Sequence, residues 1–356
     1  MPTSRNRSAD GALSGRGARK VTLRDVAQLA GVHAATVSRV LAPETRVLVN
    51  EETARRVEQA IEQLGYQPNP LARGLKTRRS TTIGVLVTDL TNPLFPPIVR
   101  GIEDRLLAAS YTALLANTDG RPERERHAYE ILSARQVDGF IMATAFRQDP
   151  LVDEAVERGV PVVLAVRTTD SRRAPAVIFD DDLGMRRAVE HLVELGHRQI
   201  AHLAGPQTIS NGARRRAAFL ASMSEHGLTV LPGQIVEADA FTLDQGEQAV
   251  ARLLDADVPF SAVIAGNDLM AVGALSALAA AGRSCPQDVS VVGFNDMPLA
   301  DRLSPPLTSL HVPHHDLGVQ AAELLLERLR DPDAPVREVS VEETLVVRGS
   351  TAPPGA

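Results

Sequence analysis

The apolar positions of the first 66 residues follow the period of an α-helix. The stretch "VTLRDVAQLAGVHAATVSRVL" at 21–41 contains two such runs. Thr22 and Asp25 form a capping-box pattern that starts the first helix, and Gly31 suits its end. A second helix is expected from Ala34 to Leu41. Two short helices joined by a tight turn predict a helix-turn-helix, whose second helix enters the major groove of DNA. An ordinary helical hairpin in an all-α core has the same spacing.

A third helix is expected after this pair. Asn50 is a typical N-cap residue, and Gly65 suits the C-terminal end. The segment "YQPNPLARGLKTRRS" follows, and its two prolines end the third helix. The turn Leu71–Leu75 is amphipathic, but Gly74 costs about 1 kcal/mol of helix stability relative to alanine. We therefore expect this turn to order only against a partner.

From residue 81 onward, short apolar runs alternate with amphipathic stretches. Strands are expected at 81–87, 111–117, 137–144, 160–166, 176–180, 200–205, 261–266 and 289–294. Helices are expected at 96–109, 123–134, 149–159, 182–195, 213–226, 243–255, 268–281 and near 315–330. The alternation predicts two similar α/β halves, each with parallel strands and crossover helices. The apolar segments at 307–313 and 339–350 come after both halves and must each join one of them. Ligands bind beyond the carboxyl ends of such strands, and two facing halves form a cleft.

Charge is distributed unevenly along the chain. Residues 1–80 carry 14 basic and 7 acidic side chains, whereas the rest carries 24 arginines and 37 acidic residues. A basic head on an acidic body is typical of a nucleic-acid-binding module joined to another domain. One cysteine, Cys285, excludes an internal disulfide and fits a reducing cytoplasm. No apolar run approaches the roughly 18 residues of a membrane span, and the N-terminus lacks the apolar region of a secretory signal.

Three motifs within residues 21–79 carry a resemblance. "DVAxxAGV" stands at 25–32, "TVSRVL" at 36–41 and "GYxPNxxARxL" at 65–75. With these motifs the segment resembles the lactose-repressor/galactose-repressor (LacI/GalR) family of bacterial transcription regulators. The resemblance implies a hinge helix at 71–75, with Leu75 wedged between the central base pairs of the operator. It implies DNA contacts from Thr22, His33, Ala34, Ala35, Thr36, Ser38, Arg39, Asn50, Tyr66, Asn69, Ala72 and Leu75.

The recognition helix departs from the family pattern at its start. His33 stands where serine is usual, and its imidazole can take over the capping role. Ala34 and Ala35 match the two positions that select operator bases in relatives. Methyl groups form no bidentate hydrogen bonds and only contact a thymine methyl or allow close approach. Base reading is therefore expected to shift to Arg39, which suits guanine.

The resemblance continues over the body through "HLxxLGHxxIAxLAGP" at 191–206, "AGNDxMAxGAL" at 265–275, "VSVVGFND" at 289–296 and "PPLTSL" at 305–310. It implies a periplasmic-binding-protein-like core of two Rossmann-like α/β subdomains. It implies effector contacts from Phe95, Arg167, Arg215, Phe241, Asn267 and Asn295. Each has an alternative: Arg215 lies in an arginine run typical of a solvated helix face, Asn267 is also a helix cap, and the phenylalanines are also core residues.

Three positions of the expected pocket are less polar than in sugar-binding members. Val166 stands where Asp or Asn is common, Val312 where Gln is, and Asn295 where Asp is. A site that loses hydrogen-bonding groups loses discrimination for hydroxyls. A sugar or related metabolite is still the expected effector.

The expected domains are a disordered basic tail at 1–20, a helix-turn-helix domain at 21–66, a hinge helix and linker at 67–80, and an effector-binding and dimerisation body at 81–350. Within the body, one subdomain is expected at about 81–178 and 310–337, and the other at about 179–309 and 338–350.

The sequence thus predicts a dimeric, sequence-specific transcriptional repressor that binds a double-stranded, pseudo-palindromic operator under effector control. No enzyme motif is present, neither a phosphate-binding loop nor a nucleophile elbow, and no cofactor is expected. The histidines of "HVPHH" at 311–315 lack a metal-ligand pattern, and Asp180–Asp182 suit a helix start better than a cation site. Two alternatives stay open: a ligand-binding protein with a vestigial DNA role, and a regulator controlled by a partner protein.

Overall fold

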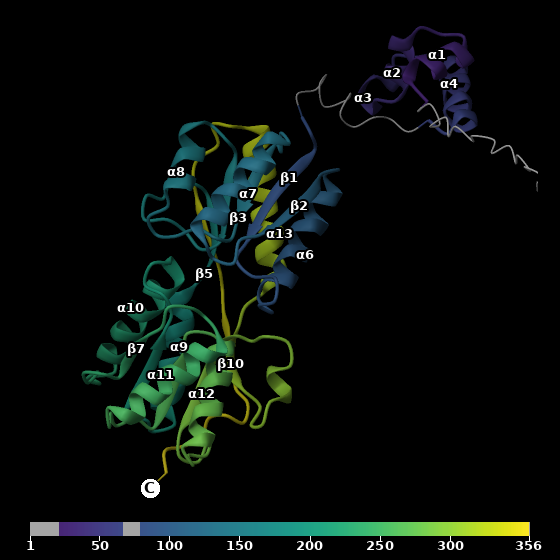
Figure 1. Ribbon diagram of the computed structural model, residues 1–356. Coiled ribbons are helices and arrows are strands. Elements are labelled where there is room, and N and C mark those ends of the chain that lie inside the picture. The colour runs from purple at the N-terminus through teal and green to yellow at the C-terminus, as the bar shows by residue number, and fades with distance from the viewer. Residues whose placement is uncertain (1–20, 67–78, 356) are drawn as a thin grey trace, which may run out of the picture. The chain divides into compact units, whose positions relative to one another are not determined.

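The computed structural model describes residues 21–66 and 79–355. They belong to two compact units, residues 1–78 and 79–356, whose described parts are called the head and the body (Figure 1). The expected tail at 1–20 and hinge helix at 71–75 lie outside the described residues.

The head is a small bundle around a single apolar core. Its helices are α1 (Leu23–Ala30), α2 (Ala34–Val40), α3 (Pro43–Arg46) and α4 (Glu51–Leu64). Val26, Val37 and Val57 have no exposed surface and meet at the centre of this core. The helix-turn-helix prediction is confirmed. The four-residue helix α3, which begins at a proline, was not predicted because one helical turn has too few positions to show a period.

The helix ends of the head form as the local sequence predicts. The Thr22 backbone N donates to Asp25 Oδ2 at 2.8 Å, and the Thr22 hydroxyl accepts from the Asp25 backbone N at 3.4 Å. Asn50 Oδ1 accepts from the Thr53 backbone N at 2.8 Å. Gly31 and Gly65 end α1 and α4 with left-handed φ values of 65° and 58°, where a residue without a side chain is least strained.

The body contains two six-stranded sheets. The N-subdomain sheet has the order β11-β5-β4-β3-β1-β2, all parallel. Its strands are β1 (Thr82–Val87), β2 (Thr112–Asn117), β3 (Gly139–Met142), β4 (Val162–Val166), β5 (Ala176–Phe179) and β11 (Glu338–Val341). Helices α6 (Phe95–Ala108) and α13 (His314–Arg330) pack together on one face, and α7 (Pro122–Ala134) and α8 (Pro150–Glu157) cover the other (Figure 1).

The C-subdomain repeats this design with the order β12-β10-β9-β8-β6-β7. Its strands are β6 (Ile200–Ala204), β7 (Ile235–Glu237), β8 (Ala262–Ala265), β9 (Ser290–Asn295), β10 (Thr308–His311) and β12 (Thr344–Val346), and only β12 runs antiparallel to its neighbour. Helices α9 (Asp181–Glu194) and α10 (Ser210–Glu225) pack on one face, and α11 (Leu243–Asp255) and α12 (Asp268–Ala280) on the other. Both α/β halves are therefore as predicted, except that the three-residue strand β7 was missed.

Three short connections join the subdomains: β5 to α9, β10 to α13, and β11 to β12. Two predicted boundaries are wrong here. Segment 338–341 belongs to the N-subdomain, because β11 pairs with β5, and residues 310–311 belong to the C-subdomain, because β10 pairs with β9. The apolar pattern of these edge strands does not reveal which sheet supplies their hydrogen bonds. None of the described helices is long and apolar enough to cross a membrane.

Candidate functional sites

The outer face of α2 carries the residues predicted to meet DNA. His33, Ala35 and Arg39 are exposed, while Ala34, Thr36 and Ser38 are half-buried. The inner face, with Val37 and Val40, is buried in the head core. His33 Nδ1 accepts from the Ala35 backbone N at 3.2 Å, so the imidazole caps α2 as expected.

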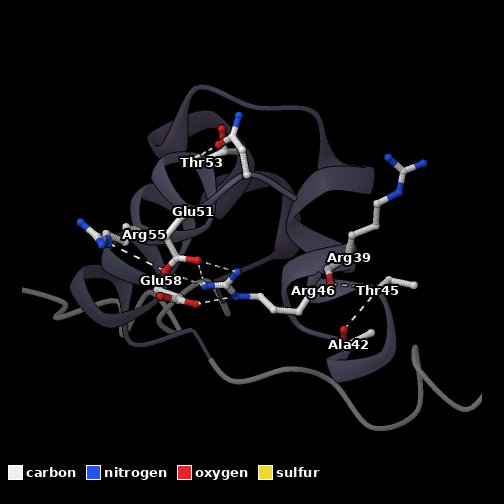
Figure 2. A network of polar contacts seen from close by, with 9 residues as sticks. Arg39, Ala42, Thr45, Arg46, Glu51, Thr53, Arg55 and Glu58 are labelled. Atoms are coloured by element: carbon white, nitrogen blue, oxygen red, sulfur yellow. Dashed lines mark hydrogen bonds and ion pairs between the residues drawn. The ribbon is translucent and has the colours of Figure 1, made fainter. Parts of the chain in front are cut away.

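A polar network holds the C-terminal end of α2 in place (Figure 2). The Thr45 hydroxyl donates to the Arg39 carbonyl oxygen at 3.0 Å. The Arg46 guanidinium lies 3.3 Å from the Glu51 carboxylate and 3.1 Å from that of Glu58. Figure 2 shows the Arg39 side chain extending away from this network. The network thus fixes the backbone that carries Arg39 and leaves its guanidinium accessible.

Sequence reasoning missed Thr45 and Arg46, because their partners lie on other helices at no helical spacing. Of the remaining residues predicted to contact DNA, some lie in the described part of the head and some lie outside it. Thr22 and Asn50 cap α1 and α4, and Tyr66 is half-buried against the head core. Asn69, Ala72 and Leu75 lie outside the described residues.

A cavity of about 480 Å³ lies between the two subdomains of the body. Its walls follow the carboxyl ends of strands from both sheets, where ligands of α/β proteins bind. All six residues predicted to contact an effector line it: Phe95, Arg167, Arg215, Phe241, Asn267 and Asn295. The six residues predicted from the sequence therefore lie in one cavity. Their contact with a ligand stays a prediction.

Three side chains of this cavity hold buried polar atoms without a hydrogen-bond partner in the described part of the chain. They are Arg167 Nε, Arg215 Nη2 and Asn295 Oδ1, two donors and one acceptor. An unpaired buried polar group costs about 1–3 kcal/mol, so such groups call for an explanation. Three larger hollows of the body, of about 600, 880 and 510 Å³, are lined by none of the described residues with unpartnered buried atoms, and a hollow of about 460 Å³ is lined by one, Arg216. The cleft cavity is therefore the candidate ligand site.

The backbone is strained at two cavity residues. Val166, at the end of β4, has a φ of 69°, and Asn295, at the end of β9, has a φ of 104°. A β-branched residue such as valine strongly disfavours this region. Strained backbone tends to cluster at ligand sites, where the surrounding structure holds it. The strain at Val166 directly precedes Arg167 and so helps set the direction in which that side chain leaves the strand.

Arg215 is buried rather than part of a solvated arginine face, with 1% of its surface exposed. Its Nε donates to Asp181 Oδ1 at 2.7 Å and its Nη1 to the Gly266 carbonyl oxygen at 2.6 Å. The guanidinium carbon lies 3.4 Å from the centre of the Phe294 ring. The side chain is thus held on three sides and keeps only Nη2 without a partner.

Asn267 caps α12, since its Oδ1 accepts from the Met270 backbone N at 2.9 Å, and its Nδ2 donates to the Phe241 carbonyl oxygen at 3.3 Å. The predicted capping role is confirmed. Asp180 likewise caps α9 by accepting from the Leu183 backbone N at 3.2 Å, as expected for the acidic run at 180–182.

On the opposite wall, Arg167 belongs to a second buried charge group. Its Nη1 donates to the Thr144 carbonyl oxygen at 3.2 Å, and the Thr144 hydroxyl donates to the Glu125 carboxyl. Burial raises the pKa of Glu125 to about 7 and lowers that of Arg167 to about 10. Arg167 therefore stays charged at neutral pH.

The histidines of "HVPHH" do not converge on one point. His311 Nδ1 lies 3.1 Å from Asp296 and His315 Nε2 lies 3.1 Å from Asp104, whereas His314 is buried edge-on against Phe179. The three side chains therefore have different neighbours, and His314 Nε2 has no hydrogen-bond partner among the described residues.

A head with a helix-turn-helix and a body of two α/β subdomains around a cleft define the class of ligand-controlled DNA-binding regulators. Residues 22–69 match the family described as bacterial regulatory proteins, lacI family, and residues 189–351 match a periplasmic binding protein-like domain. The chain is 34% identical to the ribose operon repressor of Escherichia coli (strain K12) over 331 residues, 92% of this chain and 99% of that protein.

Two solved structures are also similar over almost the whole chain. The lac repressor dimer bound to operator and the anti-inducer ONPF has a TM-score of 0.82 at 29% identity, covering 94% of this chain and 100% of that one. The complex of the transcriptional regulator CelR with cellobiose has a TM-score of 0.72 at 32% identity, covering 93% and 99%. The chain belongs to the lacI family. It is an effector-controlled, DNA-binding repressor and not an enzyme.

Proposed function

We propose that this repressor binds a pseudo-palindromic operator as a homodimer and that a sugar or related metabolite in the cleft cavity controls its affinity for DNA. The observation that carries the effector site is the set of three unpartnered polar atoms on Arg167, Arg215 and Asn295. Hydroxyl groups both donate and accept hydrogen bonds, so a polyhydroxylated molecule satisfies all three. The similar regulator CelR was solved with cellobiose, which supports this ligand class.

The same atoms suggest how the signal is transmitted. Arg167 belongs to the N-subdomain, whereas Arg215 and Asn295 belong to the C-subdomain, and short connections join the two. A ligand that bonds to both subdomains favours one relative orientation over others. DNA affinity then changes with occupancy, and the operator changes effector affinity by the same factor.

For the operator we propose that α2 lies in the major groove, with Arg39 bonded to a guanine and Ala34 and Ala35 reading methyl groups or shape. The hinge helix proposed at 71–75 adds minor-groove contacts, with Asn69, Ala72 and Leu75 against the central base pairs. Exposed apolar side chains at the open edge of the N-subdomain sheet, Leu107, Leu115 and Ile131, support a dimer interface there. Analytical ultracentrifugation of Leu115→Lys tests it, with weakened self-association expected and an unchanged dimer as the contradicting result.

The decisive experiment is a salt-dependent gel shift of the full-length protein on the DNA upstream of its own gene, with and without a panel of sugars and related metabolites. We expect specific binding to a palindrome and a shift in affinity with at least one compound. Weaker binding identifies an inducer, and tighter binding a corepressor. Arg215→Gln should abolish the response while keeping DNA binding. Absence of any specific site would overturn the proposal, and binding that no compound alters would favour control by a partner protein.

A further inference from the structure

Near Arg215 and Asp181, outside the residues that line the cavity, lies a second buried carboxyl to which no role has been assigned. Glu343 sits in the connection between β11 and β12 and has no exposed surface. Neither of its carboxyl oxygens has a hydrogen-bond partner in the described part of the chain. It packs directly against the first turns of α9, where a Cβ placed on Gly184 would lie 1.6 Å from Glu343 Oε2. The position of this carboxyl is therefore closely fixed.

Asp181 and Glu343 together place two carboxyls around one guanidinium. Burial raises the pKa of both, and the charge of Arg215 acts against this rise at each. Asp181 is 2.7 Å from Arg215 Nε, whereas Glu343 makes no hydrogen bond, so the ion pair belongs to Asp181 and the proton to Glu343. Asp180 and Arg187 also act on Glu343, with opposite signs, and Asp182 and Arg214 act on Asp181 in the same opposed way. The group of Arg215, Asp181 and Glu343 then carries no net charge.

The rest of the cavity offers an anion no compensation. Arg167 is the only other positively charged side chain among the described lining residues, and the buried Glu125 acts on it. Asp89, Asp119 and Asp239 also line the cavity. Asp119 and Asp239 are exposed, and Asp119 pairs with Arg124. An anion entering this cavity would lose its hydration against two guanidiniums that already face buried carboxyls, Asp181 and Glu125, which is unfavourable.

Building on the proposed function, we propose that Asp181 and Glu343 neutralise Arg215 so that the cavity accepts an uncharged, hydroxylated ligand and rejects phosphorylated or carboxylated ones. Arg215 then acts as a hydrogen-bond donor through Nη2 and not as an anion-binding charge. Specificity of this kind works by excluding the wrong ligand.

The two carboxyls substitute for each other, which gives the proposal a distinctive test. In Asp181→Asn the proton leaves Glu343, and in Glu343→Gln the Asp181 pair remains, so each single variant stays neutral. Only the double variant D181N/E343Q uncovers the positive charge of Arg215. We expect calorimetric titration of the full-length protein with inorganic phosphate at pH 7.5 to show at least tenfold tighter binding by the double variant than by wild type or either single variant. Adding Arg215→Gln should remove the gain.

Phosphate binding to wild type as tight as to the double variant would overturn the proposal, and so would the absence of a gain in the double variant. A second measurement needs only the isosteric single variants. Glu125 and Asp268, with pKa values of about 7, are also partly protonated at pH 7.5, so the measurement is an infrared difference spectrum of each variant against wild type. It should show that one carbonyl stretch of a protonated carboxyl is lost in both Glu343→Gln and Asp181→Asn. An unchanged band in either single variant would contradict the shared proton. These readouts do not involve DNA, so they fail or succeed separately from the gel-shift test of the effector's role.

Discussion

The head and the body present their functional side chains in opposite ways. In the head, Arg39 is exposed on a short helix, and its guanidinium extends away from the polar network around it. In the body, Arg215 is 1% exposed and is held by Asp181, Gly266 and Phe294. A surface that reads DNA has to project its donors into a groove, whereas a site for a small molecule has to surround it.

The difference also affects how each unit tolerates substitution. Exposed charges interact through water and contribute little to folding. A buried ion pair contributes little net stability, but removing one partner leaves the other charge buried and alone. DNA contacts of the head should therefore change without unfolding it, while the cavity charges of the body are also part of its stability.

The largest expected effect is on the body. Arg215→Leu leaves the buried Asp181 carboxylate with only the more distant Arg214, at 3.9 Å, and should lower the free energy of unfolding of the body by about 3–5 kcal/mol. Urea unfolding followed by circular dichroism measures this loss. Arg46→Leu is the matched control in the head, where the guanidinium pairs at the surface with Glu51 and Glu58. An equal loss in both variants would remove the contrast between the units.

The second largest expected effect is a difference between the two units in how acid changes their stability. Burial lowers the pKa of His202 and of His314 to about 4, and both lie in the body. Each keeps its full contribution to stability above pH 6.5 and loses it as pH falls toward 4, because the unfolded chain binds the proton first. The raised pKa values of Glu125 and Asp268 act in the opposite direction, so a variant is needed to isolate the histidine effect.

Between pH 7.5 and 4.5, wild type should lose about 2–3 kcal/mol more unfolding free energy than His202→Gln. Urea denaturation at the two pH values provides the measurement. Amide exchange in the head should show no matching change, since His33 is exposed and is the only histidine among the head's described residues. An equal loss of unfolding free energy between pH 7.5 and 4.5 in wild type and His202→Gln would show that His202 is not the source of the acid sensitivity.

The next expected effect is on DNA binding by the head. Arg39→Ala should weaken operator binding by about 1–3 kcal/mol and relax the preference at one operator position. The measurement is a gel-shift series over operators substituted at each base pair. Arg55→Ala on α4 is the matched control, because it removes an exposed positive charge outside the recognition helix. An unchanged preference at every position would show that Arg39 reads no base.

The smallest effect concerns a helix end. Asn50→Ala removes the cap that accepts from Thr53 and should destabilise α4 by about 1 kcal/mol. Amide exchange in α4 should then accelerate about fivefold, with no change in the body. Asn50→Asp keeps an acceptor at this position and should restore protection. Equal exchange in wild type and Asn50→Ala would mean that the cap contributes nothing.

Features that depend on neighbours in the chain were predicted well. The caps at Thr22, His33 and Asn50 and the ends at Gly31 and Gly65 form between residues at most three or four positions apart. The alternation of strands and helices likewise revealed both α/β halves. The misses were α3 and β7, which are too short to show a period, the sheet to which residues 310–311 of β10 belong, and the sheet to which β11 belongs. Strand pairing in that case joins 338–341 to 176–179.

The sequence by itself determined the fold, the family and six of the residues that line the cavity, because helix signals, hydrophobic periods and motifs are local. Only the tertiary structure revealed that Arg215 is shared by Asp181 and Glu343, which lie 34 and 128 positions away along the chain. In the sequence Glu343 is one of two adjacent glutamates, and Arg215 is one arginine in a run of three. Burial decides their role, since charges that water would screen at the surface must balance one another in the interior.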